Sequence, residues 1–249
     1  MGLADRIREI SAEGGILEKL EGLRSALIRI FLVVAVLSTL SFFLWREVLH
    51  FLHKPLGLPL IMYSLPEAFL TSLRVSLFLG IFLAAPFIFH GLWIALGPLL
   101  SLPPGWGSWA VVLGAAALFY GGAFFCYFFV LPVAINFLVH YGSENLKPMI
   151  GLSKYLSFSI GLILAFGVVF ELPLILLILG RVGLVNYSFL ARNRRYALLI
   201  NSILSALITP TPDAYTMLLM MIPIQALYEI SIWLVKIFGK PRMIEAEPS

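Results

Sequence analysis

The chain reads Phe-Gly-Val-Val-Phe-Glu-Leu-Pro from Phe166 to Pro173, and this stretch decides the fold. It lies in an apolar run from Tyr155 to Gly180, in which Glu171 is the only charged residue. A run of this length predicts a membrane-spanning helix. A carboxylate inside such a helix costs roughly 2.5–3.5 kcal/mol on insertion scales. Pro173 cannot donate a hydrogen bond to the Val169 carbonyl, so we expect the helix to kink there.

Two such costs within one turn make Glu171 and Pro173 the first candidate for a functional polar site inside the membrane. Ten residues separate Glu171 from Arg181, roughly 15 Å along a helix, which places the carboxyl near the midplane or in the cytoplasmic half. Two interpretations stay open. Glu171 is either a structural residue that hydrogen-bonds within the bundle or a polar site that faces a substrate or partner.

Composition fixes the class of protein. Hydrophobic residues make up 61% of the 249 residues and charged residues 12%, and the mean hydropathy is +1.00. These values predict an all-α, polytopic membrane protein without a soluble domain. We expect one integral membrane domain over 1–249, with a cytoplasmic amphipathic segment at 1–25 and a cytoplasmic tail at 237–249. Six apolar segments are apparent, at about 26–44, 74–95, 109–139, 152–180, 196–208 and 214–235.

Lysine and arginine residues predict the orientation. With a cytoplasmic N-terminus, twelve of them fall on inner segments and five on outer ones, as the positive-inside rule requires. Both termini are then cytoplasmic, in the plasma (inner) membrane, and the net charge of +4 reflects topology, so it does not argue for nucleic acid. The inner residues are Arg6, Arg8, Lys19, Arg24, Arg29, Arg181, Arg192, Arg194, Arg195, Lys236, Lys240 and Arg242, and the outer ones are Arg46, Lys54, Arg74, Lys147 and Lys154.

The last two segments are short. The apolar part of the fifth, 196–208, has 13 residues, about 20 Å of helix against a ~30 Å hydrocarbon core. The sixth is apolar for only about 15 residues before Glu229. Either the bilayer thins around two short spanning helices or the pair is a re-entrant hairpin. We favour short spanning helices.

Catalytic and metal sites are not indicated. Cys126 is the only cysteine, the four histidines lack metal-ligand spacing, and no phosphate-binding GxxxxGK[ST] loop is present. His50 and His53 share a helix face and are interpreted as an interfacial polar pair. Glycines such as Gly121–Gly122 and Gly161 are expected to allow close helix packing. We therefore predict a protein that is not an enzyme and binds no metal or cofactor.

The stretch from Ala165 to Pro173, with Tyr155-Leu-Ser-Phe before it, resembles the fourth helix of the TatC family. TatC is the core subunit of the twin-arginine translocase, which moves folded proteins across membranes. The resemblance runs from about residue 17 to 238. It implies six transmembrane helices in a cupped bundle, with both termini inside and a short final pair. Other matching stretches are Pro66-Glu-Ala-Phe69 with Arg74, Phe128-Phe-Val-Leu-Pro132, Thr209-Pro-Thr-Pro-Asp213, Ile222-Pro223 and Leu227-Tyr-Glu-Ile230.

In the family, the N-terminal segment and the loop between helices two and three bind the signal peptide, whose paired arginines suit carboxylates. The family pattern His-Leu-x-Glu-Leu-Arg appears here as Lys-Leu-Glu-Gly-Leu-Arg over 19–24. Arg24 is retained, Gly22 takes the acidic position, and the displaced Glu21 is rotated by about 100° on a helix. The resemblance makes Glu21 and Arg24 the candidate signal-peptide residues.

The loop between helices two and three departs further from the family. Ala95 stands at its aromatic position and Pro104 at its acidic one, and the segment 95–108 carries no charge. We weigh two explanations. Either acidic residues of the N-terminal segment compensate, or the chain is a specialised TatC paralogue with altered recognition. The acidic residues in question are Asp5, Glu9, Glu13, Glu18 and Glu21, which also fit a solvated amphipathic face.

Further candidate residues follow from the resemblance, which implies contacts to single-span TatA/TatB-like subunits through the outer hairpin and the fifth helix. For the hairpin and the last helix they are Pro210, Pro212, Asp213, Tyr228 and Glu229, and for the outer cap they are Glu67, Phe69 and Arg74, where the family usually has lysine. Asp213 also fits a helix N-cap, Glu67 a cap on the second helix, and Glu229 a carboxylate that reaches the surface.

The resemblance implies a translocase subunit that docks twin-arginine signal peptides and recruits TatA/TatB-like partners for export driven by the proton-motive force. A homo-oligomer within a receptor complex is also implied. The competing hypothesis is a small-molecule or ion secondary transporter with a buried glutamate. Such a carrier more naturally shows internal repeats and a polar lining on several helices, and we find neither in the sequence.

Overall fold

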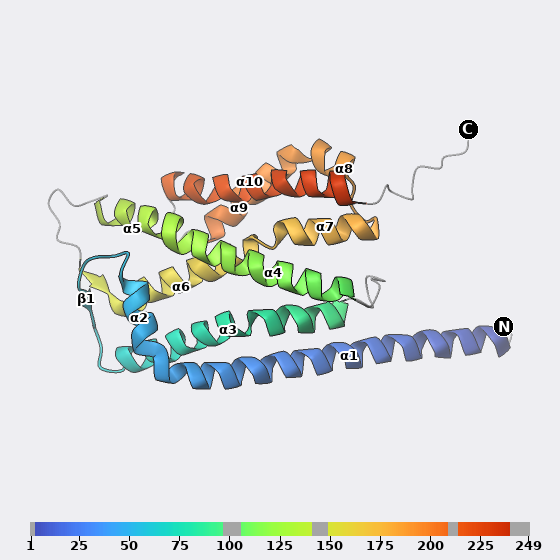
Figure 1. The fold of residues 1–249 in the computed structure, drawn as a ribbon, viewed down its shortest axis with the longest axis horizontal. Coiled ribbons are helices and arrows are strands. Elements are labelled where there is room, and N and C mark those ends of the chain that lie inside the picture. Colours follow the sequence, from blue (N-terminus) through green and yellow to red (C-terminus); the bar gives the residue numbers. More distant parts are fainter. Residues whose placement is uncertain (1–2, 97–105, 141–148, 209–213, 240–249) are drawn as a thin grey trace.

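The computed structural model describes residues 3–96, 106–140, 149–208 and 214–239. Its helices run roughly along one axis, from α1 (Leu3–Ser41) at one edge to α10 (Ala214–Phe238) at the other (Figure 1). The start of α1 and the end of α10 lie at the same end of the bundle, here called the terminal end. The opposite end, which carries α2 (Trp45–His53) and a small β-pair, is called the cap end.

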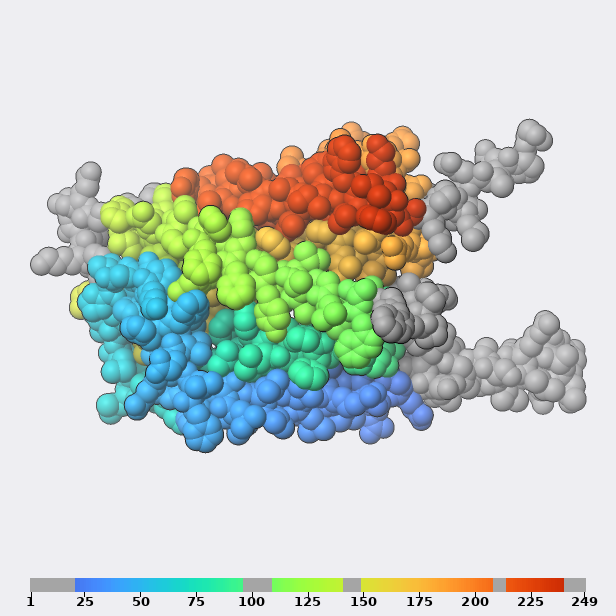
Figure 2. Space-filling model, in the orientation of Figure 1, coloured from blue at the N-terminus to red at the C-terminus, as the bar shows by residue number. Residues whose placement is uncertain are grey.

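Five helical segments of the described chain are long and apolar enough to cross a membrane, which confirms an all-α polytopic membrane protein. Side chains on α1 such as Phe31, 72% exposed, give its outer surface the apolar character that lipid contact requires. Figure 2 shows one face of the molecule, on which α1 (blue), α3 (teal), α4 (green) and α10 (red) follow one another from bottom to top. The five segments are Glu21–His53, Glu67–Ala95, Trp109–His140, Leu152–Val182 and Ala214–Phe238.

The first hairpin packs α1 closely against α3 (Glu67–Leu96). A Cβ atom at Gly80 would lie 2.6 Å from the Ser38 Cα atom, so only glycine permits this approach of the two backbones. Between the two helices, a short 3-10 turn, η1 (Phe42–Leu44), leads into α2, which folds over the cap end.

The third span combines α4 (Trp106–Phe125), a π-helical turn η2 (Cys126–Val130) and α5 (Leu131–His140). In the π turn, the Leu131 N–H donates to the Cys126 carbonyl. Pro132 follows directly and has no N–H for the helix ladder, a cost that a local π turn accommodates.

The fourth span is interrupted where the sequence predicts a kink. The helix α6 (Leu152–Val169) ends four residues before Pro173, and α7 (Leu172–Val182) begins after a turn at Phe170 and Glu171. The predicted effect of Pro173 is therefore confirmed, and it is a complete break between two helices. At the terminal end, α7 stops at Gly183, which has a left-handed φ of 86° that suits glycine.

The prediction of two short final helices is half right. After α8 (Tyr187–Arg192), α9 (Arg194–Ile208) has 15 residues, about 22 Å, too few for it to count among the five spans. The last helix, α10, has 25 residues, about 37 Å, so a short sixth helix is wrong. It continues past Glu229 through a further apolar stretch to Phe238, and the Glu229 carboxylate pairs with Arg194 at 2.9 Å.

The cap end contains a parallel β-pair that sequence reasoning missed. The strand β1 (Leu60–Ile61) pairs with β2 (Ile150–Gly151), with Leu60 opposite Ile150. Two residues per strand are too few for any period-2 pattern to show in the sequence. The pair joins the loop before α3 to the start of α6.

Candidate functional site

Glu67 connects two segments at the cap end. Its Oε2 atom accepts hydrogen bonds from the backbone N–H groups of Tyr63 at 2.6 Å and Ser64 at 3.4 Å. Its Oε1 atom accepts from the N–H of Ser153 at 2.9 Å. Ser153 is in the first turn of α6, where backbone N–H groups lack helical acceptors. Glu67 therefore caps α6, and its bond to the Ser64 N–H also closes the turn that precedes its own helix, so the structure shows both cap roles.

Arg74 reaches the same serine from the next turns of α3. Its Nη1 atom donates to the Oγ atoms of Ser153 at 2.7 Å and Ser157 at 2.8 Å. Glu67 and Arg74 are thus brought together around the start of α6. Phe69, the third residue predicted for the outer cap, is 60% exposed and lines a groove with Ser38 and Phe42 of the first span.

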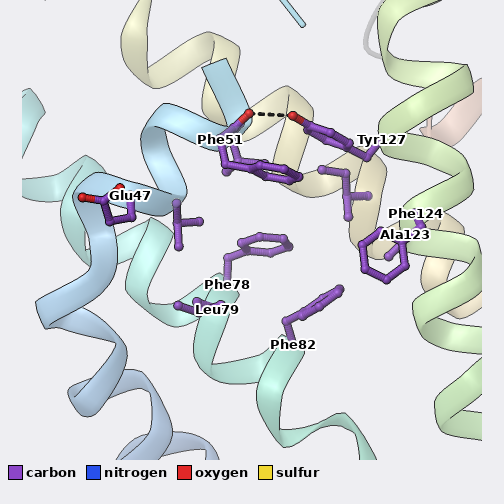
Figure 3. A pocket seen from close by; sticks show the side chains of 11 residues that line it. Glu47, Phe51, Phe78, Leu79, Phe82, Ala123, Phe124 and Tyr127 are labelled. Carbon is purple, nitrogen blue, oxygen red and sulfur yellow. Dashed lines mark hydrogen bonds between the residues drawn. The ribbon is translucent and has the colours of Figure 1, made fainter. Parts of the chain in front are cut away.

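Two buried tyrosines hold the end of α2, a role that no sequence pattern signalled. The hydroxyl of Tyr127 donates to the Phe51 carbonyl at 2.7 Å, and the hydroxyl of Tyr155 donates to the Leu52 carbonyl at 2.7 Å. The Phe51 and Tyr127 rings also stack with centroids 4.3 Å apart (Figure 3). The Phe51 carbonyl also accepts from the Lys54 N–H at 3.3 Å, and both tyrosine bonds bind the end of α2 to the neighbouring spans.

An apolar cavity of about 280 Å³ lies beneath this contact, lined by side chains from α2, α3 and the third span (Figure 3).

His53 of α2 pairs through Nε2 with the Leu58 carbonyl at 2.7 Å. Within the described residues, no three His, Cys, Asp or Glu side chains gather as a metal site would require.

Glu171 occupies the break between α6 and α7 and is 6% exposed. Its Oε1 atom is buried without a hydrogen-bond partner in the part of the chain that the structure describes. The residue lines a cavity of about 220 Å³ between α3, α4 and α7. Pro173, buried in the first turn of α7, fixes the turn that holds this carboxyl. The other cavity walls are apolar and include Phe89, Trp93, Val112, Ala115, Leu174 and Ile178.

Close packing of α4 against α6 positions the Glu171 turn. A Cβ atom at Gly122 would lie 2.6 Å from the Phe166 carbonyl oxygen and 2.7 Å from Cγ of Phe170. The prediction of close helix packing is confirmed at Gly122. It is wrong at Gly121 and Gly161, where a Cβ atom would meet nothing within 4 Å.

At the terminal end, Tyr228 and Glu229 both have partners within the chain. The Tyr228 hydroxyl is buried and donates to the Leu190 carbonyl at 2.9 Å, which ties α10 to α8. The Glu229 carboxylate accepts from Arg194 at 2.9 Å, and this pair is partly exposed. Both residues therefore stabilise the packing of the last helices against each other.

The predicted signal-peptide residues lie on α1 toward the terminal end. Glu21, Gly22 and Arg24 are all exposed there. Ala95, at the end of the second span, is 7% exposed. Pro104, Pro210, Pro212 and Asp213 lie outside the described residues.

This multi-pass helical bundle is similar to known proteins. A family model described as the Sec-independent protein translocase protein (TatC) matches residues 18–223. The chain belongs to the TatC family.

TatC relatives cover nearly the whole chain. The TatC protein of Carboxydothermus hydrogenoformans is 35% identical over 233 residues, which span 92% of this chain and 96% of that protein. The TatC protein of Desulforapulum autotrophicum is 39% identical over 236 residues, which span 92% and 87%. A crystal structure of the twin-arginine translocase receptor TatC has a TM-score of 0.79 at 33% identity, and it covers 88% of this chain and 98% of that chain.

The family predicted from the sequence is therefore confirmed. The chain is a TatC subunit of the twin-arginine translocase, a multi-pass membrane protein of protein transport and not an enzyme. The residues around Glu171 are one of several stretches that resemble TatC, and they lie at the break in the fourth span.

Proposed function

We propose that this TatC subunit docks twin-arginine signal peptides at its terminal end and uses the Glu171 cavity to bind a polar side chain of a single-span TatA/TatB-like partner. The single observation that carries the proposal is the buried Oε1 atom of Glu171, which has no partner among the described residues and lines an apolar cavity. Such a group is costly at membrane depth unless a ligand satisfies it.

The orientation that we propose has the terminal end in the cytoplasm and the cap end outside. Basic residues support it, since Arg24, Arg192 and Lys236 lie toward the terminal end and Arg46 and Lys54 at the cap end. We also propose that α9 is a sixth, short crossing. Its 15 residues then require local thinning of the bilayer, at a modest cost per ångström of mismatch.

Geometry favours a partner helix as the ligand of Glu171. The cavity lies beside α3, α4 and α7, which belong to membrane-spanning segments. A polar side chain that approaches from the lipid would gain a hydrogen bond in a medium without water to compete for it. The structural alternative is that Glu171 forms hydrogen bonds within the bundle. Its Oε1 atom has no partner among the described residues, so nothing there supports this alternative.

Signal-peptide docking is proposed on Glu21 and Arg24, which are exposed on α1. Gly22 removes the carboxylate that the family pattern places between them, so we propose recognition altered from that of other TatC proteins. The outer segment with Phe69 and the hairpin with Pro210, Pro212 and Asp213 are proposed as further partner contacts. Assembly as a homo-oligomer and use of the proton-motive force complete the proposal.

Substitution of Glu171 tests the cavity. We expect Glu171→Ala to fold but to lose cross-linking to a TatA/TatB-like partner and to lose transport in a strain that lacks TatC. Glu171→Gln keeps the shape and the hydrogen-bonding capacity without the charge, so its activity measures the need for the carboxylate. Full transport by Glu171→Ala would refute a role for this residue in partner binding.

Peptide binding tests docking separately. Purified protein is expected to bind a twin-arginine peptide more tightly than its Lys-Lys version, because the arginine fork can pair with a carboxylate in two places. Equal affinity for the two peptides would refute signal recognition and leave the Glu171 proposal standing.

A further inference from the structure

Another cavity, with Arg29 and His90 in its wall, lies between α1 and α3, toward the terminal end. Its volume is about 170 Å³, several times the ~30 Å³ that one water molecule takes in the liquid. It is separate from the Glu171 cavity, which lies between α3, α4 and α7. Its lining includes Arg29, Ile30 and Val33 from α1 with Phe87, His90 and Ile94 from α3.

Arg29 supplies the positive charge of this wall. Its Nε atom donates to the Ser25 carbonyl at 3.3 Å, and its Nη2 atom donates to the Ser25 Oγ atom at 3.2 Å. A guanidinium has five N–H donors, so two bonds to the preceding turn anchor the group and leave donors for a ligand. Arg29 is exposed as a residue, which keeps the guanidinium accessible from the lipid side.

His90 faces the same cavity from α3. Its Nδ1 atom is buried and has no hydrogen-bond partner among the described residues. The ring is held in place by stacking on Trp109, with centroids 4.9 Å apart and 16° between the planes. A buried ring nitrogen without a partner is costly and calls for a ligand.

The depth of these two groups fits the headgroup region of one leaflet. His90 lies six residues before Leu96, the last residue of α3, about 9 Å along the helix. Arg29 lies three residues after Ala26, where the first apolar segment begins, about 5 Å by the same rise. An arginine at that depth can extend its guanidinium toward the interface.

We propose that this cavity binds the phosphodiester headgroup of an anionic phospholipid. The phosphate oxygens accept hydrogen bonds from Arg29 and His90, and the acyl chains follow the exposed apolar side chains of Val36 and Leu40, which continue the Arg29 face of α1. The volume holds a phosphodiester but not the chains, which therefore lie outside it. The described lining contains no carboxylate, so nothing there holds the ammonium group of a zwitterionic lipid. Basic pockets between transmembrane helices bind anionic headgroups in this way.

Native mass spectrometry of the full chain in neutral detergent tests the proposal. The probes are phosphatidylglycerol and phosphatidylcholine with the same acyl chains. We expect the protein to retain phosphatidylglycerol preferentially. Arg29→Gln should weaken that binding about five- to tenfold, and His90→Phe, which keeps the stack on Trp109, about threefold.

Arg192→Gln is the matched control, because Arg192 is an exposed arginine of α8 that does not line the cavity. It should leave phosphatidylglycerol binding unchanged. Equal weakening by Arg29→Gln and Arg192→Gln would show diffuse attraction and overturn the site. Displacement of the lipid by millimolar inorganic phosphate would overturn the assignment to a lipid in favour of a free anion.

Folding of each variant is checked by its size-exclusion profile. Should Arg29→Gln fail to fold, Arg29→Lys gives an equivalent test, because lysine keeps the charge but loses the planar fork that grips a phosphate. We expect about a threefold weakening for Arg29→Lys. Binding as tight as that of the natural chain would overturn the proposed contact.

Discussion

Alanine at Gly122 is expected to disturb the helix contact that positions Glu171, whereas alanine at the neighbouring Gly121 is not. A Cβ atom at Gly122 would lie 2.6 Å from the Phe166 carbonyl oxygen. Backbone cannot rotate away as a side chain can, so α4 and α6 must separate by roughly 0.8 Å to reach ordinary contact at about 3.4 Å. The Phe170 ring, directly before Glu171, must shift as well.

The two substitutions gain the same helix propensity, but only one of them also introduces overpacking. Replacing glycine by alanine inside a helix gains roughly 0.8–1 kcal/mol for both. Only Gly122→Ala adds overpacking, which costs about 1–3 kcal/mol. The difference between the variants is therefore about 1–3 kcal/mol, or roughly 2–12 °C in melting temperature at about 2–4 °C per kcal/mol for a chain of this size.

Thermal stability by fluorescence-detected size exclusion in one detergent measures this difference, and transport in a strain that lacks TatC measures its consequence. We expect Gly121→Ala to melt at or above the natural chain and to transport normally. Gly122→Ala should melt below Gly121→Ala and transport less, because the Glu171 turn is displaced. Equal melting temperatures for the two variants would refute the close approach of α4 and α6 at this point.

Two further predictions concern the ends of the bundle. Tyr228→Phe removes the bond to the Leu190 carbonyl, which then keeps only the Asn193 N–H as donor among the described residues, and should cost about 1 kcal/mol, seen as a lower melting temperature; unchanged stability would contradict the tie between α8 and α10. Arg74→Leu removes the bonds to Ser153 and Ser157 and should cost roughly 1 kcal/mol at this exposed site, whereas lysine there should retain most of the stability. If lysine were as damaging as leucine, the hydrogen bonds would not be the reason.

Local sequence was sufficient for the features that depend on composition and on the chain's own backbone. The apolar runs predicted membrane helices because lipid excludes charge over about 20 residues of helix. Pro173 predicted the break after Val169 because a missing N–H acts within one turn. Short stretches that match the TatC family, in order from Pro66 to Ile230, identified the family.

Sequence reasoning failed where the answer depended on a distant residue. The last helix was expected to be short because Glu229 ends its apolar stretch, but the helix runs on to Phe238. The Glu229 carboxylate has its partner, Arg194, 35 positions away in the chain. Gly121 and Gly122 are equivalent as letters. Only the packing of α4 against α6 makes Gly122 indispensable for the close approach of the two helices and leaves Gly121 in open space.

By itself, the sequence determined the membrane class, the family, the position of the helix break and the cost of a carboxylate at Glu171, since each follows from properties of one continuous segment. The tertiary structure decided which side chains meet. It brought the Glu67 carboxylate to the first turn of α6 and left Oε1 of Glu171 without a partner in the described chain. It also brought Arg29 and His90 to one cavity. These contacts join residues far apart in sequence, and their geometry is set by helix packing, which periodicity along one helix does not encode.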